Sequence, residues 1–186
     1  MGTTASLKLD DKEYPLPIIV GTEGEKAIDT RQLRASTGYI AYDQGYGNTG
    51  SCESLITYLD GDNGILRHRG YPIDQLAHHS DFVETAYLVI YGELPTQQQR
   101  KDFGLLLRKN AAVETQMQKI LEGFPTNASP MAMLSALVSA LPAYHADLAT
   151  NNFEKDMKHF DLAAAIAISK IRTFVAMIYR YQKGLP

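Results

Sequence analysis

The histidines of this chain are the side chains best suited to proton transfer at neutral pH, but their spacing does not assemble a site. His78 and His79 are adjacent and point in different directions, and no cysteine or acid stands at metal-ligand spacing from them. His68, between two arginines in an expected strand, fits packing or hydrogen bonding better than catalysis. His145 and His159 have no evident acid partner in the sequence. The histidine pattern therefore predicts no catalytic or metal-binding residue.

Two glycine-containing motifs match ligand-binding loops in letters but not in context. Gly45–Gly50 fits G-x-G-x-x-G, yet a dinucleotide loop needs a hydrophobic strand before it and a helix after it, whereas 51–59 predicts a strand. Asp60–Gly64 begins like a calcium loop, but Ile65 stands where that loop needs glycine and Tyr71 where it needs an acid. We interpret the first motif as a glycine-rich loop and the second as a hairpin turn.

Cysteine and serine chemistry are equally unsupported. Cys52 is the only cysteine, with no basic cluster beside it to lower its pKa, and no G-x-S-x-G motif marks a nucleophilic serine. No catalytic, cofactor-binding or metal-ligating residue is therefore predicted. A lone thiol also fits a reducing, cytoplasmic setting.

The composition is that of a soluble globular protein. The 186 residues are 45% hydrophobic and 21% charged, with a net charge of −3. The charges are interspersed, which argues against nucleic acid and anionic membrane as partners. The N-terminus lacks the pattern of a secretory signal, and the uncharged stretch 123–146 has too short an apolar part to span a membrane. We interpret that stretch as a buried helix.

The expected elements form a small β-rich segment, 1–70, followed by a helical region, 71–186. In the first segment Ser6–Leu9 and Tyr14–Val20 predict a hairpin, and Pro15 and Pro17 assign its second strand to a sheet edge. A short helix is expected from a cap at Asp29-Thr30 to Gly38. The strands of a second hairpin are expected at Ser54–Leu59 and Ile65–Arg69.

Capping signals divide the helical region. Helices are expected from Asp81 to Gly92, from Thr96 to Asn110, over Val113–Leu121, over 130–146 with a kink at Pro142, and from Asn152 to Lys183. The fold class is therefore mainly α, with all-α packing behind a small N-terminal β segment.

The helix over 130–146 is apolar on nearly every side and so requires cover on every side. Ala132, Ala136 and Ala140 recur every four residues, as do Ser135 and Ser139, and small residues at this spacing let two helices approach closely. Self-association through this helix, or a missing remainder of the chain, would supply that cover.

Several motifs, in order, resemble those of citrate synthases. They are SCESLITYLDGDNGILRHRGYPIDQLA at 51–77, AYLVIYGELPT at 86–96, FPTNASPMAMLSALVSAL at 124–141 and SKIRTFVAMIYRYQKGLP at 169–186. The strands expected in 6–20 are similar to the extra N-terminal strands of the type II, bacterial form. The resemblance implies the start of the helical large domain of that family. It also implies a homodimer or hexamer that associates through the helix 130–146.

The resemblance implies an acyltransferase of the tricarboxylic acid cycle that condenses acetyl-CoA with oxaloacetate to give citrate and CoA, without metal or cofactor. The family's catalytic aspartate, histidines and arginines lie downstream of the matched part, so this chain alone is expected to be inactive. A 2-methylcitrate synthase, which uses propionyl-CoA, and a stand-alone dimerisation or regulatory module remain alternatives. The end at residues 184–186, just after an apolar helix, favours a fragment of a longer enzyme.

Some type II enzymes are inhibited by NADH at a site built from this portion. The aligned positions here are Lys109, Asn110, Ala111, His145, Ile166 and Lys170. The family pattern is kept at Lys170 and conservatively replaced at Lys109, so the resemblance implies that NADH regulation is absent.

Overall fold

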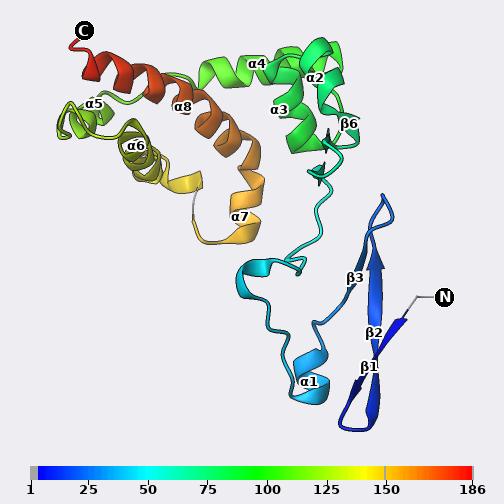
Figure 1. Ribbon diagram of the computed structural model, residues 1–186. Helices are drawn as coiled ribbons and strands as arrows, with labels where there is room; N and C mark the ends of the chain where they lie inside the picture. The colour runs from blue at the N-terminus through cyan, green and yellow to red at the C-terminus, as the bar shows by residue number, and fades with distance from the viewer. Residues whose placement is uncertain (1–3, 149, 186) are drawn as a thin grey trace. The chain divides into compact units, whose positions relative to one another are not determined.

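The computed structural model describes residues 4–148 and 150–185 of the chain (Figure 1). It divides into two compact units, Met1–Leu55 and Ile56–Pro186, each described by itself. Residues 1–3, 149 and 186 lie outside the described residues. The start of the predicted segment 1–70 and the end of the predicted region 71–186 are among them.

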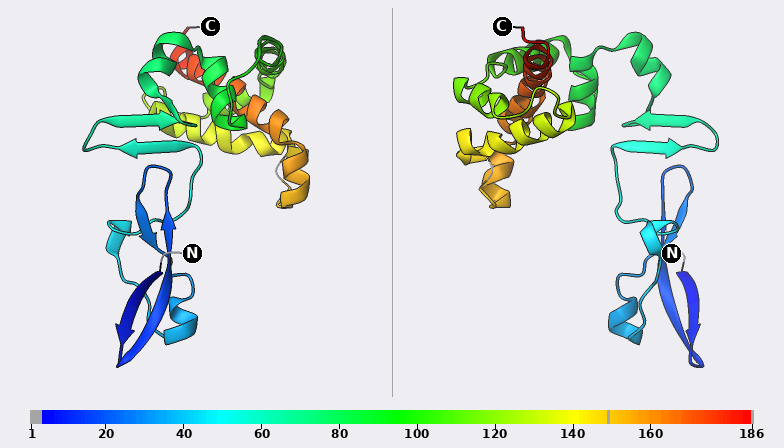
Figure 2. Two further views of the ribbon diagram at one scale, coloured as in Figure 1. Left: turned by 90° about the vertical axis from the view of Figure 1, so that its right-hand side faces the viewer. Right: turned by 60° about the vertical axis from the view of Figure 1, so that its left-hand side comes forward.

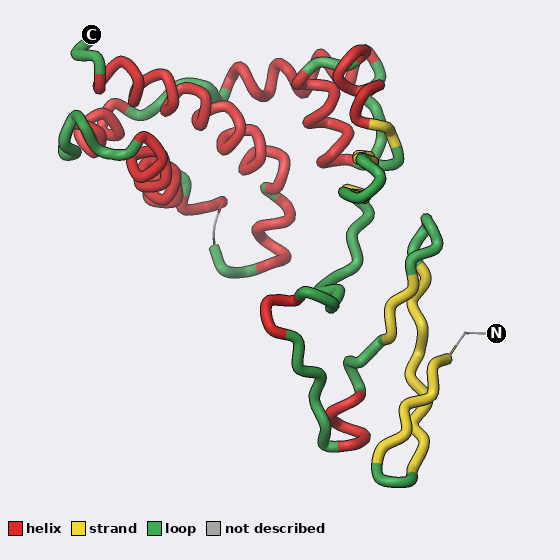
Figure 3. The backbone as a smooth tube through the Cα atoms, viewed as in Figure 1, coloured by secondary structure: helices red, strands yellow, loops and turns green. Residues whose placement is uncertain are grey.

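The first unit is built on an antiparallel sheet in the order β1-β2-β3, shown as yellow tube in Figure 3. Its strands are β1 (Thr4–Leu9), β2 (Lys12–Val20) and β3 (Lys26–Ile28). The β1–β2 hairpin turns at Asp10 and Asp11, both with positive φ, which short polar side chains tolerate. The predicted hairpin is confirmed.

The predicted edge position of the proline-containing strand is wrong, because β2 is the central strand. Pairing explains how two prolines fit there. Pro15 and Pro17 pair with β1, while β3 begins to pair only at Ile18. The Pro17 carbonyl accepts from Asp29 on the side away from β1, so the Pro17 nitrogen also faces that side. Pro17 therefore lies where the β2–β3 pairing ends, and Pro15 lies beyond it, in a stretch of β2 that is an edge locally.

The short helix of this unit, α1 (Leu33–Thr37), ends as predicted at Gly38 with φ of 79°. The expected cap at Asp29-Thr30 is wrong. The Asp29 carboxylate instead accepts from the Arg31 side chain at 2.6 and 3.0 Å, and Gln32 takes the cap position without a side-chain bond. Because the Asp29 carboxylate is bonded to the Arg31 side chain, it does not cap the N-terminus of α1.

The second unit opens with the other predicted hairpin, which is confirmed. Its sheet, in the order β4-β5-β6, comprises β4 (Thr57–Asp60), β5 (Ile65–His68) and β6 (Tyr71–Pro72). The Asp60 carboxylate accepts from the backbone and side-chain nitrogens of Asn63 at 3.0 and 2.8 Å. Gly64 supplies the positive φ that the turn requires.

Helices make up the rest of this unit, so the fold is mainly α, although the strands exclude an all-α class. They are α2 (Ile73–His79), α3 (Phe82–Tyr91), α4 (Gln97–Lys109), α5 (Thr115–Glu122), α6 (Pro130–Tyr144), α7 (Phe153–Lys158) and α8 (Phe160–Gln182). Two predicted capping boxes are confirmed, one at Asp81 with Glu84 and one at Thr96 with Gln99.

The single C-terminal helix predicted from Asn152 is two helices. The Asn152 side chain caps α7 by accepting from the Lys155 backbone at 3.0 Å, but the helix stops at His159 (φ −107°, ψ 9°) before α8 begins. The α7 residues are not buried, whereas α8 carries six buried residues. A change of direction at His159 lets α8 enter the core while α7 stays at the surface (Figure 1).

The core lies where α8 packs against α4, α5 and α6 (Figure 2). Its larger cluster contains the buried side chains of Met117, Leu121, Met133, Leu137, Leu141, Phe174 and Ile178. Among the described residues, α8 is the one helix long and apolar enough to cross a membrane. One face of α8 is buried, and the helix contacts α4, α5 and α6.

Candidate functional site

The motifs weighed in the sequence lie at separate, structural places. Gly45, with positive φ, stands in a short 3-10 turn, Gln44–Tyr46, without the strand and helix of a dinucleotide loop, so the loop interpretation is confirmed. His78 and His79 lie in the last turn of α2, and His68 Nδ1 is 3.1 Å from Thr57 Oγ1. The described part of the chain holds no group of three or more His, Cys, Asp or Glu side chains placed to bind a metal.

The cluster with most chemical character surrounds Lys170, a buried residue of α8 that is 3% exposed. Its ammonium donates to Glu114 Oε1 at 2.9 Å and Oε2 at 3.1 Å, and also to the Ala112 carbonyl. Glu114 is the N-cap residue of α5, and Ala112 lies in the loop that connects α4 to α5. A charge of this burial persists only when it is paired and hydrogen-bonded, and here both conditions are met.

His145 belongs to the same cluster, so the expectation that it has no acid partner is wrong. Its Nε2 lies 3.2 Å from Glu114 Oε1, an ion-pair distance without hydrogen-bond alignment. His145 is the C-cap residue of α6. Three helix ends or faces therefore meet at one carboxylate. Sequence reasoning missed the contact because Glu114 and His145 belong to different helices that only the tertiary fold brings together.

Two hydroxyl groups of α8, near the lysine, bond to the C-terminal end of α4 and to the loop that follows it. Ser169 Oγ donates to the Leu107 carbonyl at 2.7 Å, and Thr173 Oγ1 donates to the Ala111 carbonyl at 3.2 Å. These carbonyls lie at and beyond the C-terminal end of α4, where backbone carbonyls have no N–H partner within the helix. The signal in the sequence was a lysine inside an apolar helix, with polar neighbours at positions −1 and +3.

Glu114 predicts how acid affects stability. Burial raises its pKa, but the Lys170 hydrogen bond, its own backbone amide and the charges of Lys170 and His145 together lower the pKa below the usual value. A pKa lower in the folded state contributes stability that is present above the unfolded value of about 4.3 and is lost as pH falls through the folded value. The unfolding free-energy difference between wild type and Glu114→Gln should shrink as the pH falls below about 5. Urea titrations from pH 3 to 7 measure this, and a difference that grows in acid would contradict it.

The exposed face of α6 carries small side chains, as the sequence predicted in part. Ala132, Ser135 and Ser139 are exposed and Ala136 is half-buried. Ala140 departs from the expected ridge, because it packs against the larger core cluster beside Leu134 and Val138. The exposed face of small side chains on α6 therefore does not include Ala140, although the four-residue repeat predicted that it would.

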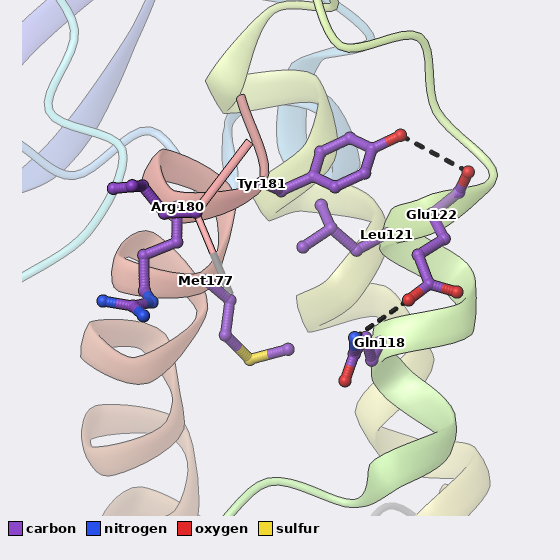
Figure 4. A pocket seen from close by; sticks show the side chains of 7 residues that line it. Gln118, Leu121, Glu122, Met177, Arg180 and Tyr181 are labelled. Atoms are coloured by element: carbon purple, nitrogen blue, oxygen red, sulfur yellow. Dashed lines mark hydrogen bonds between the residues drawn. The ribbon is translucent and has the colours of Figure 1, made fainter. Parts of the chain in front are cut away.

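A small groove lies between α5 and the C-terminal end of α8, lined by Leu121, Met177 and Tyr181 among others (Figure 4). Tyr181 donates to the Phe124 carbonyl at 2.6 Å, and Gln118 donates to Glu122 Oε1 at 2.9 Å. The groove volume of about 150 Å³ is below the roughly 300 Å³ at which small-molecule sites begin. It is a packing feature and not a candidate substrate site.

These features define a class: a helical domain entered through a β-hairpin, with one apolar helix at its centre and another presenting a face of small residues. The family described as citrate synthase, C-terminal domain, matches residues 45–186. The chain belongs to the citrate synthase family.

Solved citrate synthases share the fold. The enzyme of Thermotoga maritima is 29% identical with a TM-score of 0.64, over 78% of this chain and 36% of that one. The Pyrobaculum aerophilum enzyme is 26% identical with a TM-score of 0.63, over 91% and 39%. The Thermoplasma acidophilum enzyme, solved with carboxymethyl coenzyme A and oxaloacetate, is 24% identical with a TM-score of 0.67, over 75% and 35%. The chain thus spans 35–39% of the length of these proteins.

Proposed function

We propose that this chain is the N-terminal part of a type II citrate synthase, which condenses acetyl-CoA with oxaloacetate to give citrate and CoA. The observation that carries the proposal is the family match over 45–186, joined to a fold shared with solved citrate synthases. The β1–β2–β3 sheet, which precedes the matched region, favours the type II form. The chain's share of the family's length supports a scaffold role, with catalytic residues supplied by the part of the enzyme that it does not span.

The intact mass of the protein from its native cells tests this proposal. A species more than twice 20.6 kDa that contains these peptides, with citrate formed from acetyl-CoA and oxaloacetate, is the expected result. If the enzyme prefers propionyl-CoA as the acyl donor, the protein is a 2-methylcitrate synthase instead. A mature species of 20.6 kDa without condensing activity would favour the dimerisation or regulatory module.

Self-association through α6 is the second part of the proposal. Its support is the exposed run of small side chains, Ala132, Ser135 and Ser139, on a helix whose opposite side is already committed to the core. Small side chains let two helix backbones approach closely, and apolar neighbours such as Met131, which is 69% exposed, supply area to bury.

We expect the intact enzyme to be insensitive to NADH. Of the positions aligned with the family's NADH site, Lys170 is committed to Glu114 and Ala112, and Ile166 is buried at 6% exposure. Neither side chain is placed to contact a dinucleotide without rearrangement. Condensation rates measured with and without micromolar NADH should agree, and strong inhibition would overturn this expectation.

A further inference from the structure

The buried ammonium of Lys170 has its full set of acceptors within the chain. An ammonium has three N–H donors. Here the acceptors are Glu114 Oε1, Glu114 Oε2 and the Ala112 carbonyl. Because Lys170 is only 3% exposed, its ammonium is shielded from solvent while Glu114 is in place. The Glu114 carboxylate is therefore the counter-ion on which this lysine depends.

A second nitrogen approaches the same carboxylate from another helix. His145 Nε2 is buried, lies 3.2 Å from Glu114 Oε1 and makes no hydrogen bond within the part of the chain that the structure describes. The carboxylate of Glu114 therefore has a second nitrogen side chain beside the ammonium of Lys170, which it accepts from directly.

We infer that Lys170, His145 and the α4–α5 loop form a carboxylate-binding site whose occupant is the chain's own Glu114. The side chains of Glu114 and His145 are 26% and 23% exposed, so the site is open to solvent on one side. A small carboxylate can enter from that side once the Glu114 side chain is removed. In the wild type, the tethered carboxylate has a high effective concentration and keeps dissolved carboxylates out.

Chemical rescue tests the inference with this chain and acetate as the probe. Glu114→Ala should melt at a lower temperature than wild type, because it leaves Lys170 without its counter-ion. Sodium acetate should then raise the melting temperature of the variant by at least about 3 °C. Sodium chloride at equal ionic strength should not, and acetate should not change the wild type, whose site is filled.

Matched variants separate this from a general salt effect. Glu114→Gln, which fills the same space without charge, should show no acetate shift, and neither should Glu114→Ala combined with Lys170→Met. If Glu114→Ala does not fold in plain buffer, acetate should restore its helical circular dichroism. An equal acetate shift in wild type and variant, or no response of Glu114→Ala by either measure, overturns the inference. Because the readout is stability, the outcome does not depend on the condensation reaction.

Discussion

Replacing Ala136 with glutamate is expected to prevent the self-association that we propose for α6 and to leave monomers. Ala136 is half-buried on α6 among the exposed small residues Ser135 and Ser139. A closely packed helix pair has no room for the longer side chain and no partner for its charge. An unpaired charge in such an interface costs at least about 3 kcal/mol, which weakens association roughly 100-fold or more. Light scattering across a range of concentrations measures the mass.

The matched control is Ala77→Glu, the same change at an exposed position of α2. It should leave the mass unchanged, because a charge on a solvated helix face has no desolvation cost. An Ala136→Glu protein of unchanged oligomeric mass would show that the copies meet through another surface. A wild type that is already monomeric at these concentrations would refute self-association through α6 directly.

Truncating Phe174 to alanine is expected to produce the largest loss of stability. Phe174 is fully buried on α8 and lies in the cluster with Met133, Leu137 and Met117. Removing a buried ring forfeits its transfer free energy and leaves a cavity, a loss of about 3–5 kcal/mol. For a chain of this size the melting temperature should fall by roughly 6–20 °C.

Phe153→Ala provides the comparison, because Phe153 is 79% exposed on α7. Its unfolding free energy should stay within about 0.5 kcal/mol of wild type. Both variants are measured by urea unfolding followed by circular dichroism. Equal losses at the two positions would mean that Phe153 is covered in solution or that Phe174 is not in the core.

Local signals in the sequence were sufficient for the features that local chemistry decides. Asp81 with Glu84 and Thr96 with Gln99 each satisfy helix-end amides within four residues, so their helices begin where the sequence predicted. The turn at Asp60–Gly64 likewise depends on its own residues, since Asp60 bonds Asn63 and Gly64 supplies the positive φ.

Predictions from the sequence were wrong where residues far apart in the chain determine the local structure. The break at His159 follows from the burial of α8 against three helices, which no local pattern encodes. Pro15 and Pro17 suggested an edge strand, but whether β3 reaches them depends on the β2–β3 register. The carboxylate that joins α5, α6 and α8 was missed because its partners are brought together only by the fold.

The position of Pro15 and Pro17 in the sheet has a consequence for solubility. The stretch of β2 that β3 leaves uncovered is the kind of open edge to which strands of other molecules add during aggregation. A strand that docks there needs N–H donors at alternate positions, and at these two positions proline offers none. Replacing both prolines with threonine would restore those donors and should make the protein more prone to form intermolecular sheets. Pro15 and Pro17 are therefore expected to hinder the addition of strands from other molecules at this stretch of β2.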